Sequence, residues 1–439
     1  MKNKKQSNPI TRRNFLLNST LAAGAFTLVP RKVLGGKKYV SPNDKINLGF
    51  IGTGIQAKGL FEHFAELPDV QITACCDVDS QKLDQFKKKA ELYYAAKTGK
   101  NMYNGLNTFE KYEEMIAQPD IDAMVIFTPD HWHAIPAIAA MKAGKDVYCE
   151  KPMAHTIFEG RAMVEATRKY NRVFQTGNMQ RSWWTFRHAC ELVRNNYLGE
   201  IKKILVNVGD PAIACDLTSE PTPGYLNWDR WLGPAPKRPY NEILSPPVIQ
   251  THFPMWRDYS EYGGGILSDW GTHMFDIAQW GLGMDNSGPV KLIPPADRKA
   301  VRGLKFIYQN GVEMFHEDFK RGWAVRFIGS EGTLDVSRSF LESKPENIVY
   351  KRIGDNDTKL YRSTNHYEDW TQAIRNRNKP ICDVEIGHRS ASVCNLANIA
   401  YQLGRSLNWD PEKEEFKNDP EANKLRSKEY RKPYTLLEV

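Results

Sequence analysis

Apolar residues change their spacing along this chain in a way that predicts two kinds of structure. Between Ile46 and Thr176, short apolar runs of strand length alternate with segments whose apolar residues recur every three or four positions, as on one face of a helix. The expected strands are Ile46–Ile51, Val70–Cys76, Ala123–Phe127, Lys145–Cys149 and Val173–Thr176. One helix is expected directly after Gly54. Further helices are expected at Gln81–Ala96, Thr108–Ala117, His133–Ala143 and Thr156–Tyr170. This alternation predicts an α/β fold with a doubly wound parallel sheet.

The pattern changes from about Arg181. Residues Ile201 to Val208 alternate polar and apolar side chains, as a half-buried antiparallel strand does. Further strands are expected at Gly303–Tyr308, Val312–Phe319, Ala324–Ile328 and Thr333–Val336, and two late helices at Asn365–Arg377 and His388–Leu403. We therefore expect a second, α+β part with an open, mostly antiparallel sheet. A length of 439 residues is consistent with two domains.

A glycine turn joins the first expected strand to the first helix. Gly52 permits a tight turn, and Gly54 lets the backbone approach a pyrophosphate that the free N–H groups near Ile55 would bind. Asp77 ends the next strand, where its carboxylate can accept hydrogen bonds from a ribose 2′-hydroxyl and repel a 2′-phosphate. Glycines after a strand also occur in ordinary tight turns, and the third glycine of the strict motif is displaced to Gly59. Strand, helix, strand and acid in register nevertheless predict dinucleotide binding, with NAD favoured over NADP.

Other polar residues fall at the expected carboxyl ends of the strands, where a parallel sheet binds its ligands. They are Thr128, Glu150, Lys151 and Asn178. Lys151 precedes a proline and could hydrogen-bond a substrate hydroxyl beside the nicotinamide, or could be a surface lysine at a strand end. The neighbouring histidines His131 and His133 could form a metal or catalytic cluster, but we expect a loop that contacts the cofactor.

Asp269 and His273 follow three consecutive glycines and share one helical face. An acid beside an imidazole can fix its tautomer and tune it as a general base. The alternatives are a helix cap with a buried histidine, or a metal site that also uses Asp276; no second ligand cluster matches it, so we expect no metal. The tryptophans Trp228, Trp231 and Trp256 could stack on sugars or pack in a core.

The first 38 residues account for the positive charge of the chain. They hold nine Lys or Arg and no acid, so that the net charge of +8 becomes −1 for the remainder, which gives no support to nucleic-acid binding. Thr11-Arg12-Arg13-Asn14-Phe15-Leu16-Leu17, followed by the apolar segment Leu21–Val29, is typical of a twin-arginine export signal, although a basic tail is the alternative. We expect export to the periplasm or cell envelope, with no transmembrane segment after removal of the signal. Seven cysteines without CxxC spacing indicate neither a zinc site nor a disulfide framework.

Four motifs together resemble the glucose–fructose oxidoreductase / inositol dehydrogenase family of NAD(P)-dependent oxidoreductases. They are GFIGTG, CDVD, FTPDHWHAIPAIAAMKAGKDVYCEKP and GGGILSDWGTHMFDIAQW, and the similarity runs from about Ile46 to Gly404. The resemblance implies a nicotinamide-binding Rossmann domain joined to a C-terminal sheet domain. Together with the residue pattern, it leads us to expect a signal and linker (1–38), a Rossmann domain (45–180), a substrate-binding and oligomerisation domain (181–404) and a C-terminal tail (405–439). It also implies a homo-oligomer, a dimer or tetramer.

The resemblance assigns roles to individual residues. Lys151 matches the EKP lysine that positions cofactor and substrate, Asp269 the catalytic aspartate and His273 the general base. The expected cofactor-binding set is Gly52, Thr53, Gly54, Ile55, Gln56, Asp77, Thr128, His133, Glu150, Lys151 and Asn178. This chain departs from the family at TGNMQRSWW. The expected substrate contacts are therefore Gln180, Arg181, Trp270, Asp269 and His273.

We expect hydride transfer between a nicotinamide cofactor and a hydroxyl carbon of a sugar or cyclitol. Lys151 and His273 would handle the hydroxyl proton while Asp269 orients the imidazole. Two alternatives stay open. One is an exported enzyme that cleaves glycosides through transient oxidation by a tightly bound NAD, and the other is a non-catalytic sugar-binding module. Which sugar and which carbon react does not follow from the sequence.

Overall fold

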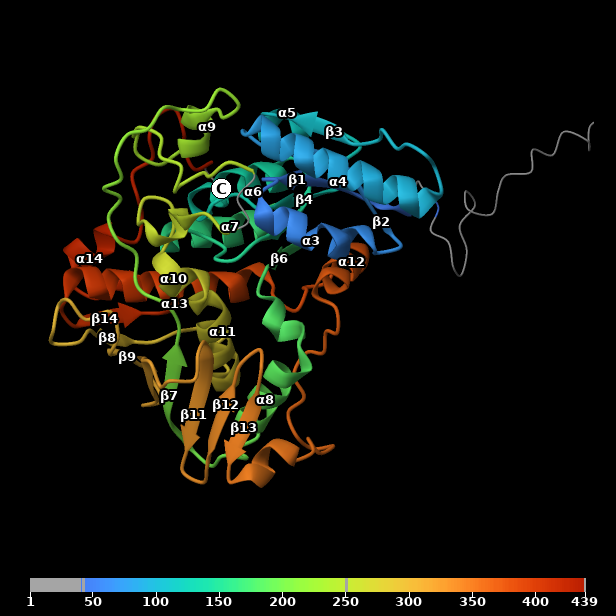
Figure 1. Cartoon of the computed structure of the whole chain (residues 1–439). Helices are drawn as coiled ribbons and strands as arrows, with labels where there is room; N and C mark the ends of the chain where they lie inside the picture. Colours follow the sequence, from blue (N-terminus) through green and yellow to red (C-terminus); the bar gives the residue numbers. More distant parts are fainter. Residues whose placement is uncertain (1–40, 42–43, 249–251, 438–439) are drawn as a thin grey trace, which may run out of the picture. The chain divides into compact units, whose positions relative to one another are not determined.

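Six parallel strands form the first sheet, in the order β3-β2-β1-β4-β5-β6. The structure is a computed structural model that describes residues 41, 44–248 and 252–437 (Figure 1). The strands are β1 (Ile46–Ile51), β2 (Val70–Cys76), β3 (Asn107–Phe109), β4 (Ala123–Ile126), β5 (Asp146–Cys149) and β6 (Phe174–Thr176). The strand order reverses between β1 and β4, so ligands are expected beyond the carboxyl ends of these two strands. The predicted doubly wound sheet is confirmed.

Helices cover both faces of this sheet. Alternate residues of β4 point to opposite faces: Val125 packs with residues of α3, α4 and α12, and Met124 packs with residues of α5, α6 and α7. The bounds are α3 (Ile55–Ala65), α4 (Ser80–Thr98), α5 (Tyr112–Ile116), α6 (Ala134–Lys142), α7 (Ile157–Lys169) and α12 (His366–Asn376). Helix α7 begins with a capping box, in which Thr156 and Glu159 satisfy each other's backbone N–H groups.

The prediction of a helix over Thr108–Ala117 is wrong in its first half. Residues Asn107–Phe109 form strand β3, which pairs with the exposed edge of β2, and α5 begins only at Tyr112. Thr108 lies opposite Cys75 in this pairing. A β-branched and an aromatic residue suit such an edge strand, and its tertiary pairing overrides a weak local helical pattern.

Nine strands form the second sheet, in the order β13-β12-β11-β7-β10-β9-β8-β14-β15. All neighbours are antiparallel except β7 and β10, so the expected mostly antiparallel sheet is confirmed. Its strands are β7 (Ile201–Asn207), β8 (Lys291–Ile293), β9 (Leu304–Ile307), β10 (Glu313–His316), β11 (Ala324–Gly329), β12 (Thr333–Val336), β13 (Leu341–Lys344), β14 (Leu407–Asp410) and β15 (Glu415–Phe416). Strands β14 and β15 lie in the segment that was expected to be a tail.

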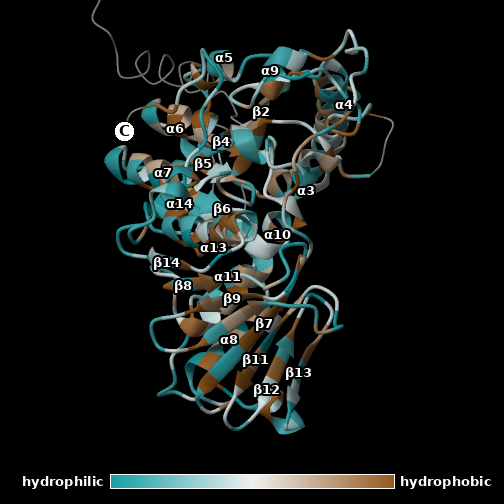
Figure 2. Ribbon diagram, turned by 90° about the vertical axis from the view of Figure 1, so that its left-hand side faces the viewer, coloured by the Kyte–Doolittle hydropathy of each residue, from teal (hydrophilic) through white to brown (hydrophobic). Residues whose placement is uncertain are grey.

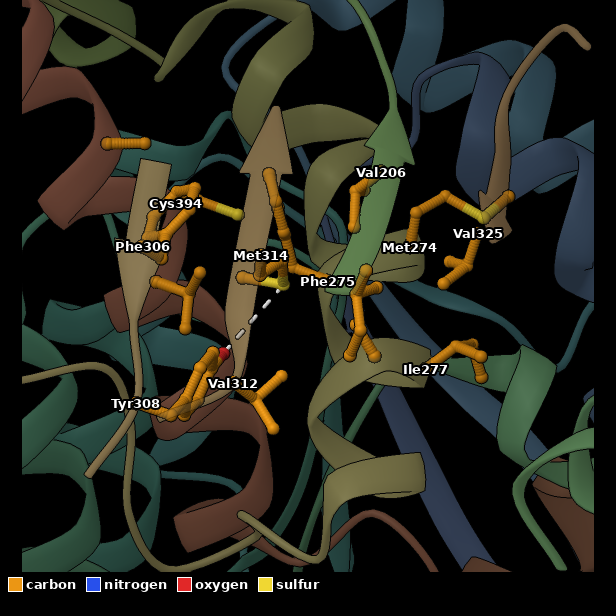
Figure 3. Packing of buried hydrophobic residues seen from close by; sticks show 14 of the residues in the cluster. Val206, Met274, Phe275, Ile277, Phe306, Tyr308, Val312, Met314, Val325 and Cys394 are labelled. Carbon is orange, nitrogen blue, oxygen red and sulfur yellow. Dashed lines mark hydrogen bonds between the residues drawn. The ribbon is translucent and has the colours of Figure 1, made fainter. Parts of the chain in front are cut away.

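Helices α8 (Trp184–Arg194), α11 (Gly271–Leu282) and α13 (Val384–Leu403) cover one face of the second sheet and share a hydrophobic core with it. Figure 2 shows α11 and α13 between β6 and this sheet. Figure 3 shows Phe275 of α11 among buried side chains of β7, β9, β10 and β11. The remaining helices are α9 (Trp228–Leu232), α10 (Gly265–Asp269) and α14 (Pro420–Lys424). Short 3₁₀ turns are η2 (Asp130–Trp132), η3 (Met179–Ser182), η4 (Met255–Asp258) and η5 (Glu346–Tyr350).

The segment between β7 and α10 has no long regular elements and bonds to both halves of the chain; it is called the connecting segment below. It contains its own aromatic cluster, in which Trp228 stacks on Trp231 at a centroid distance of 4.6 Å and Trp256 is also buried. These tryptophans therefore pack in a small core. The segment is bonded to the first sheet's half, because Ser80 N–H donates to the Tyr225 carbonyl and Asn227 N–H donates to that of Val78.

All seven cysteines are free thiols. Within the described residues, every helix is too short or too polar to cross a membrane. The export signal, residues 1–38, lies outside the described residues.

Candidate functional site

The two glycines of the first turn have different surroundings. Gly52 has a φ of +86°, and a Cβ there would lie 2.8 Å from the backbone of Phe127. A Cβ on Gly54 would meet no atom within 4 Å. Helix α3 begins directly after Gly54 with no side-chain cap and no acidic residue in its first turn. The turn thus leaves room for an anion against the positive end of α3, as a dinucleotide pyrophosphate requires.

Asp77 ends β2 and binds the glycine turn. Its Oδ2 accepts hydrogen bonds from Thr53 N–H (2.7 Å) and Thr53 Oγ1 (2.9 Å), and its Oδ1 accepts one from Asp79 N–H (3.0 Å). Burial raises the pKa of this carboxyl, while Lys82 and the bond from Thr53 act in the opposite direction. Thr53 is fully buried and faces Asp77, so the predicted cofactor residue Thr53 supports the turn from behind.

A pocket of about 1150 Å³, counted with its open mouth, lies beyond β1 and β4. Of the predicted cofactor residues, its walls include Gly52, Gly54, Ile55, Gln56, Asp77 and Thr128. The opposite wall comes from the connecting segment and was not predicted; it includes Arg230, Trp231, Ser245, Trp256 and Arg257. Lys82 of α4 joins the two walls, because its Nζ donates to Ser245 Oγ at 2.9 Å.

Two predicted cofactor residues, Thr128 in the pocket wall and Asn178, present polar atoms without partners. Thr128 Oγ1 and Asn178 Oδ1 are buried and have no hydrogen-bond partner among the described residues. Such atoms are rare in folded proteins, where a protein group, an ordered water or a bound ligand usually satisfies them. His133 behaves differently: Nδ1 lies 2.8 Å from the Pro152 carbonyl and Nε2 lies 2.9 Å from that of Thr128. It holds the loop together and does not line the pocket.

Lys151 and Asp269 form an ion pair between the two halves of the chain. Lys151 Nζ donates to Asp269 Oδ1 at 2.7 Å and to the Asp269 carbonyl at 2.9 Å. Arg257, which lines the pocket, donates to the same Oδ1 at 3.2 Å. Burial would raise the pKa of Asp269, but Lys151 and Arg257 outweigh it and bring the pKa to about 2. Asp269 is therefore a carboxylate that fixes the ammonium group of Lys151.

The expected helical pairing of Asp269 with His273 is wrong. Helix α10 ends at Asp269 and α11 begins at Gly271, so the two residues belong to different helices. The Asp269 carboxylate binds Lys151 and Arg257, and among the described residues His273 Nδ1 is buried without a partner. Burial and the charges of Lys151 and Arg338 lower the pKa of His273 well below its ordinary value. The imidazole is thus neutral, and its Nδ1 remains available for a hydrogen bond to a ligand.

Two further carboxyls are buried near this pair. Burial raises the pKa of Glu150 to about 7, against the opposing effect of Lys151. Burial and then the charge of Asp269 raise the pKa of Asp130 to about 8. Gly177, which the sequence did not single out, is needed here, since a Cβ would lie 2.7 Å from Glu150 Oε1. In the described part of the chain, His, Cys, Asp and Glu side chains form no cluster suited to a metal ion.

The predicted substrate residues have separate environments. Arg181 is fully buried, and its guanidinium donates to Asp276 (2.8 Å) and Asp285 (2.7 Å). This gives Arg181 a structural role and no support for substrate contact. Gln180 is buried and accepts a hydrogen bond from Arg338. Trp270 is half-buried, and its ring contacts that of His273 at 5.6 Å.

The fold and site define a dinucleotide-binding α/β protein of the oxidoreductase class. The chain belongs to the GFO/IDH/MocA family. Residues 46–178 match its profile "Oxidoreductase family, NAD-binding Rossmann fold", and residues 212–436 match "Oxidoreductase family, C-terminal alpha/beta domain".

Similar proteins carry names from carbohydrate chemistry. A "Glycosyl hydrolase family 109 protein" of Shewanella pealeana is 32% identical over 209 residues, which are 44% of this chain and 44% of that protein. The "1,5-anhydro-D-fructose reductase" of Ensifer adhaerens is 26% identical over 260 residues, 56% of this chain and 66% of that one. The chain thus spans less than two thirds of the length of these relatives. The crystal structure of "aldose-aldose oxidoreductase from Caulobacter crescentus complexed with glycerol" shares the fold, with a TM-score of 0.57, 19% identity, and coverage of 83% of this chain and 99% of that chain.

Proposed function

We propose that this protein transfers a hydride between a nicotinamide cofactor and a hydroxyl carbon of a sugar or cyclitol. The observation that carries the proposal is the Lys151–Asp269 ion pair, which is linked through Arg257 to the wall of the dinucleotide pocket. The names of the relatives are consistent with this substrate class.

Lys151, His273 and Asp269 have distinct tasks in this reaction. Lys151 donates a hydrogen bond to the reacting hydroxyl and stabilises negative charge that develops on its oxygen. His273 accepts the hydroxyl proton at Nδ1, which has no partner among the described residues. Asp269 holds the ammonium group in place. A bound nicotinamide ring would accept the hydride from the carbon that carries the reacting hydroxyl.

The variant Lys151→Met tests this assignment. Methionine retains the length of the side chain but removes the donor, so kcat should fall by about 10²–10⁴-fold while NAD binding is retained. Turnover is followed as NADH absorbance with a panel of sugars and cyclitols, and NAD binding by calorimetry. Lys142→Met, at an exposed position at the end of α6, is the control. Wild-type turnover by a Lys151→Met variant that binds NAD would overturn the role of Lys151.

We also propose NAD as the preferred cofactor over NADP. The support is the Asp77 carboxylate in the pocket wall, which would repel a 2′-phosphate. Asp77→Ala should therefore lower the ratio of kcat/KM with NAD to kcat/KM with NADP. Because Asp77 also holds Thr53, the ratio is interpreted only for a variant with a wild-type circular dichroism spectrum. An unchanged ratio would clear Asp77 of this role.

A second candidate is glycoside cleavage in which the cofactor is reduced and reoxidised in one cycle. The observation that favours it is the similarity to the family 109 glycosyl hydrolase protein. Product analysis distinguishes the two: release of the aglycone from an aryl glycoside without net NADH supports cleavage, and stoichiometric NADH supports net oxidation. Mass spectrometry of the purified protein would reveal a retained dinucleotide.

We propose export by the twin-arginine route to the periplasm or cell envelope, on the strength of Arg12-Arg13 and the apolar segment that follows. We further propose a homo-oligomer built through the open face of the second sheet. On that face Phe315 is only half-buried, between Lys203 and Lys305. Light scattering of the mature protein measures its mass in solution.

A further inference from the structure

Arg338, in the turn between β12 and β13, is held between two indole rings beside the candidate active site. Its guanidinium carbon lies 4.3 Å from the ring centroid of Trp270 and 5.6 Å from that of Trp183. Its Nε donates to Gln180 Oε1 at 2.9 Å, and Gln180 is fully buried. These contacts fix the position of a side chain that is exposed at the surface and would otherwise be mobile.

Arg338 has no acidic partner within the part of the chain that the structure describes. Arginines on neighbouring elements are all paired: Arg181 binds Asp276 and Asp285, Arg321 binds Glu342, and Arg326 binds Asp335. The rings of Trp183 and Trp270 lie against its guanidinium, and burial removes part of the water around it. A fixed, partly desolvated guanidinium is well suited to a planar anion such as a carboxylate.

The position of Arg338 relates it to the reacting group. Trp270 follows Asp269 in the chain, and its ring contacts His273 on one side and Trp323 on another, at a centroid distance of 4.1 Å. Lys151 and Arg257 both bind the Asp269 carboxylate, so two cations flank the residue that precedes Trp270. Burial lowers the pKa of Arg338, and the charges of Asp269 and Glu150 act in the opposite direction.

Exposed aromatic surface lies next to this guanidinium. Trp183 is 38% exposed and Trp323 is 41% exposed, which is unusual for tryptophan. Indole faces offer large, rigid contact area to a ring with C–H groups, while the arginine nitrogens offer hydrogen bonds. The cluster therefore combines an apolar platform with a single cation.

We propose that Arg338, together with Trp183, Trp270 and Trp323, forms a subsite for the negatively charged substituent of a sugar. The substituent is the carboxylate of a uronic acid or a sulfate ester, both of which accept hydrogen bonds from a guanidinium. The inference rests on the proposed function and narrows its substrate class to acidic sugars. The negative group lies at Arg338, and the reacting hydroxyl lies at Lys151.

Binding of matched sugar pairs to the NAD-loaded, full-length protein tests the subsite by calorimetry. The pairs are D-glucuronate with D-glucose and D-galacturonate with D-galactose, and D-glucose 6-sulfate separates sulfate from carboxylate recognition. The acidic member of at least one pair, or the sulfate, should bind wild type about tenfold or more tightly than its neutral counterpart, as a charge-assisted hydrogen bond permits. Arg338→Met should abolish this preference, and Arg338→Lys should keep part of it.

The control is Arg321→Met, which removes the same charge from a neighbouring turn where the guanidinium is bound to Glu342. It should retain the preference of wild type. The inference is overturned if no acidic sugar is preferred by wild type, or if Arg338→Met keeps the preference. The proposed function is tested separately, by the loss of turnover of neutral sugars in Lys151→Met. If that loss is observed while the acidic preference is absent, only the subsite is overturned.

Discussion

At the scale of single residues, the two glycines of the first turn should respond oppositely to substitution. Gly52→Ala places a Cβ in the left-handed region and against the Phe127 backbone, so we expect a loss of about 2 kcal/mol or more in the free energy of unfolding. Gly54→Asp places a favourable N-cap residue in open space, so stability should be retained.

The same Gly54→Asp variant should lose cofactor affinity. Its carboxylate would face the pyrophosphate at close range, where like charges cost on the order of a few kcal/mol, so NAD should bind at least about tenfold more weakly. Urea denaturation and NAD calorimetry on both glycine variants check the pair. Retained NAD affinity in Gly54→Asp would show that the phosphates do not pass this turn.

At the scale of elements, an ion cluster joins η3 to α11. Arg181 of η3 binds Asp276 of α11 and Asp285 after it, and Ser390 Oγ of α13 also donates to Asp276. Arg181→Met would leave the carboxylate of Asp276 buried and unpaired, which should cost about 3–5 kcal/mol in the free energy of unfolding.

A double variant distinguishes this structural role from the predicted substrate contact. Arg181→Met with Asp276→Leu removes both buried charges and should recover much of the stability lost in the single variant, as measured by urea denaturation. If Arg181→Met instead keeps wild-type stability and weakens sugar binding, the original prediction for Arg181 holds after all.

At the scale of the whole molecule, the burial of Asp130 should make stability depend on pH. The groups that influence it come from distant parts of the chain: Asp269, Arg257, Lys151 and Lys428. The pKa of Asp130 is raised from 3.8 to about 8 on folding, so the unfolded state is ionised at pH values where the folded state keeps its proton. This contribution to stability is complete below about pH 4 and is lost as the pH rises towards 8.

Asp130→Asn should remove this dependence. The amide cannot ionise, so the Tm of the variant should fall less than that of wild type between pH 5 and pH 8, as followed by scanning calorimetry. Asp84→Asn, at an exposed position on α4, is the control for the loss of one carboxylate. Parallel profiles of wild type and Asp130→Asn would contradict the prediction.

Local sequence patterns were sufficient to predict a feature that depends on residues close to it in the chain. The glycine turn, Asp77 at the end of β2 and the Thr156 capping box needed only neighbours in the sequence, and the structure contains all three. The strand β3 was missed because its pairing with β2 supplies the hydrogen bonds that decide it. The ion pairing of Arg181 was not predicted for a related reason, since its partner Asp276 is 95 residues away.

The sequence by itself determined the doubly wound sheet, the dinucleotide turn and the candidates Lys151, Asp269 and His273, because periodicity and motif spacing are local properties. Only the tertiary structure decided that Asp269 binds Lys151, 118 residues away, rather than His273. It also decided that the connecting segment forms the second wall of the pocket and that Arg338 lies unpaired beside Trp270. These contacts depend on how distant surfaces pack against each other, and no local pattern records that packing.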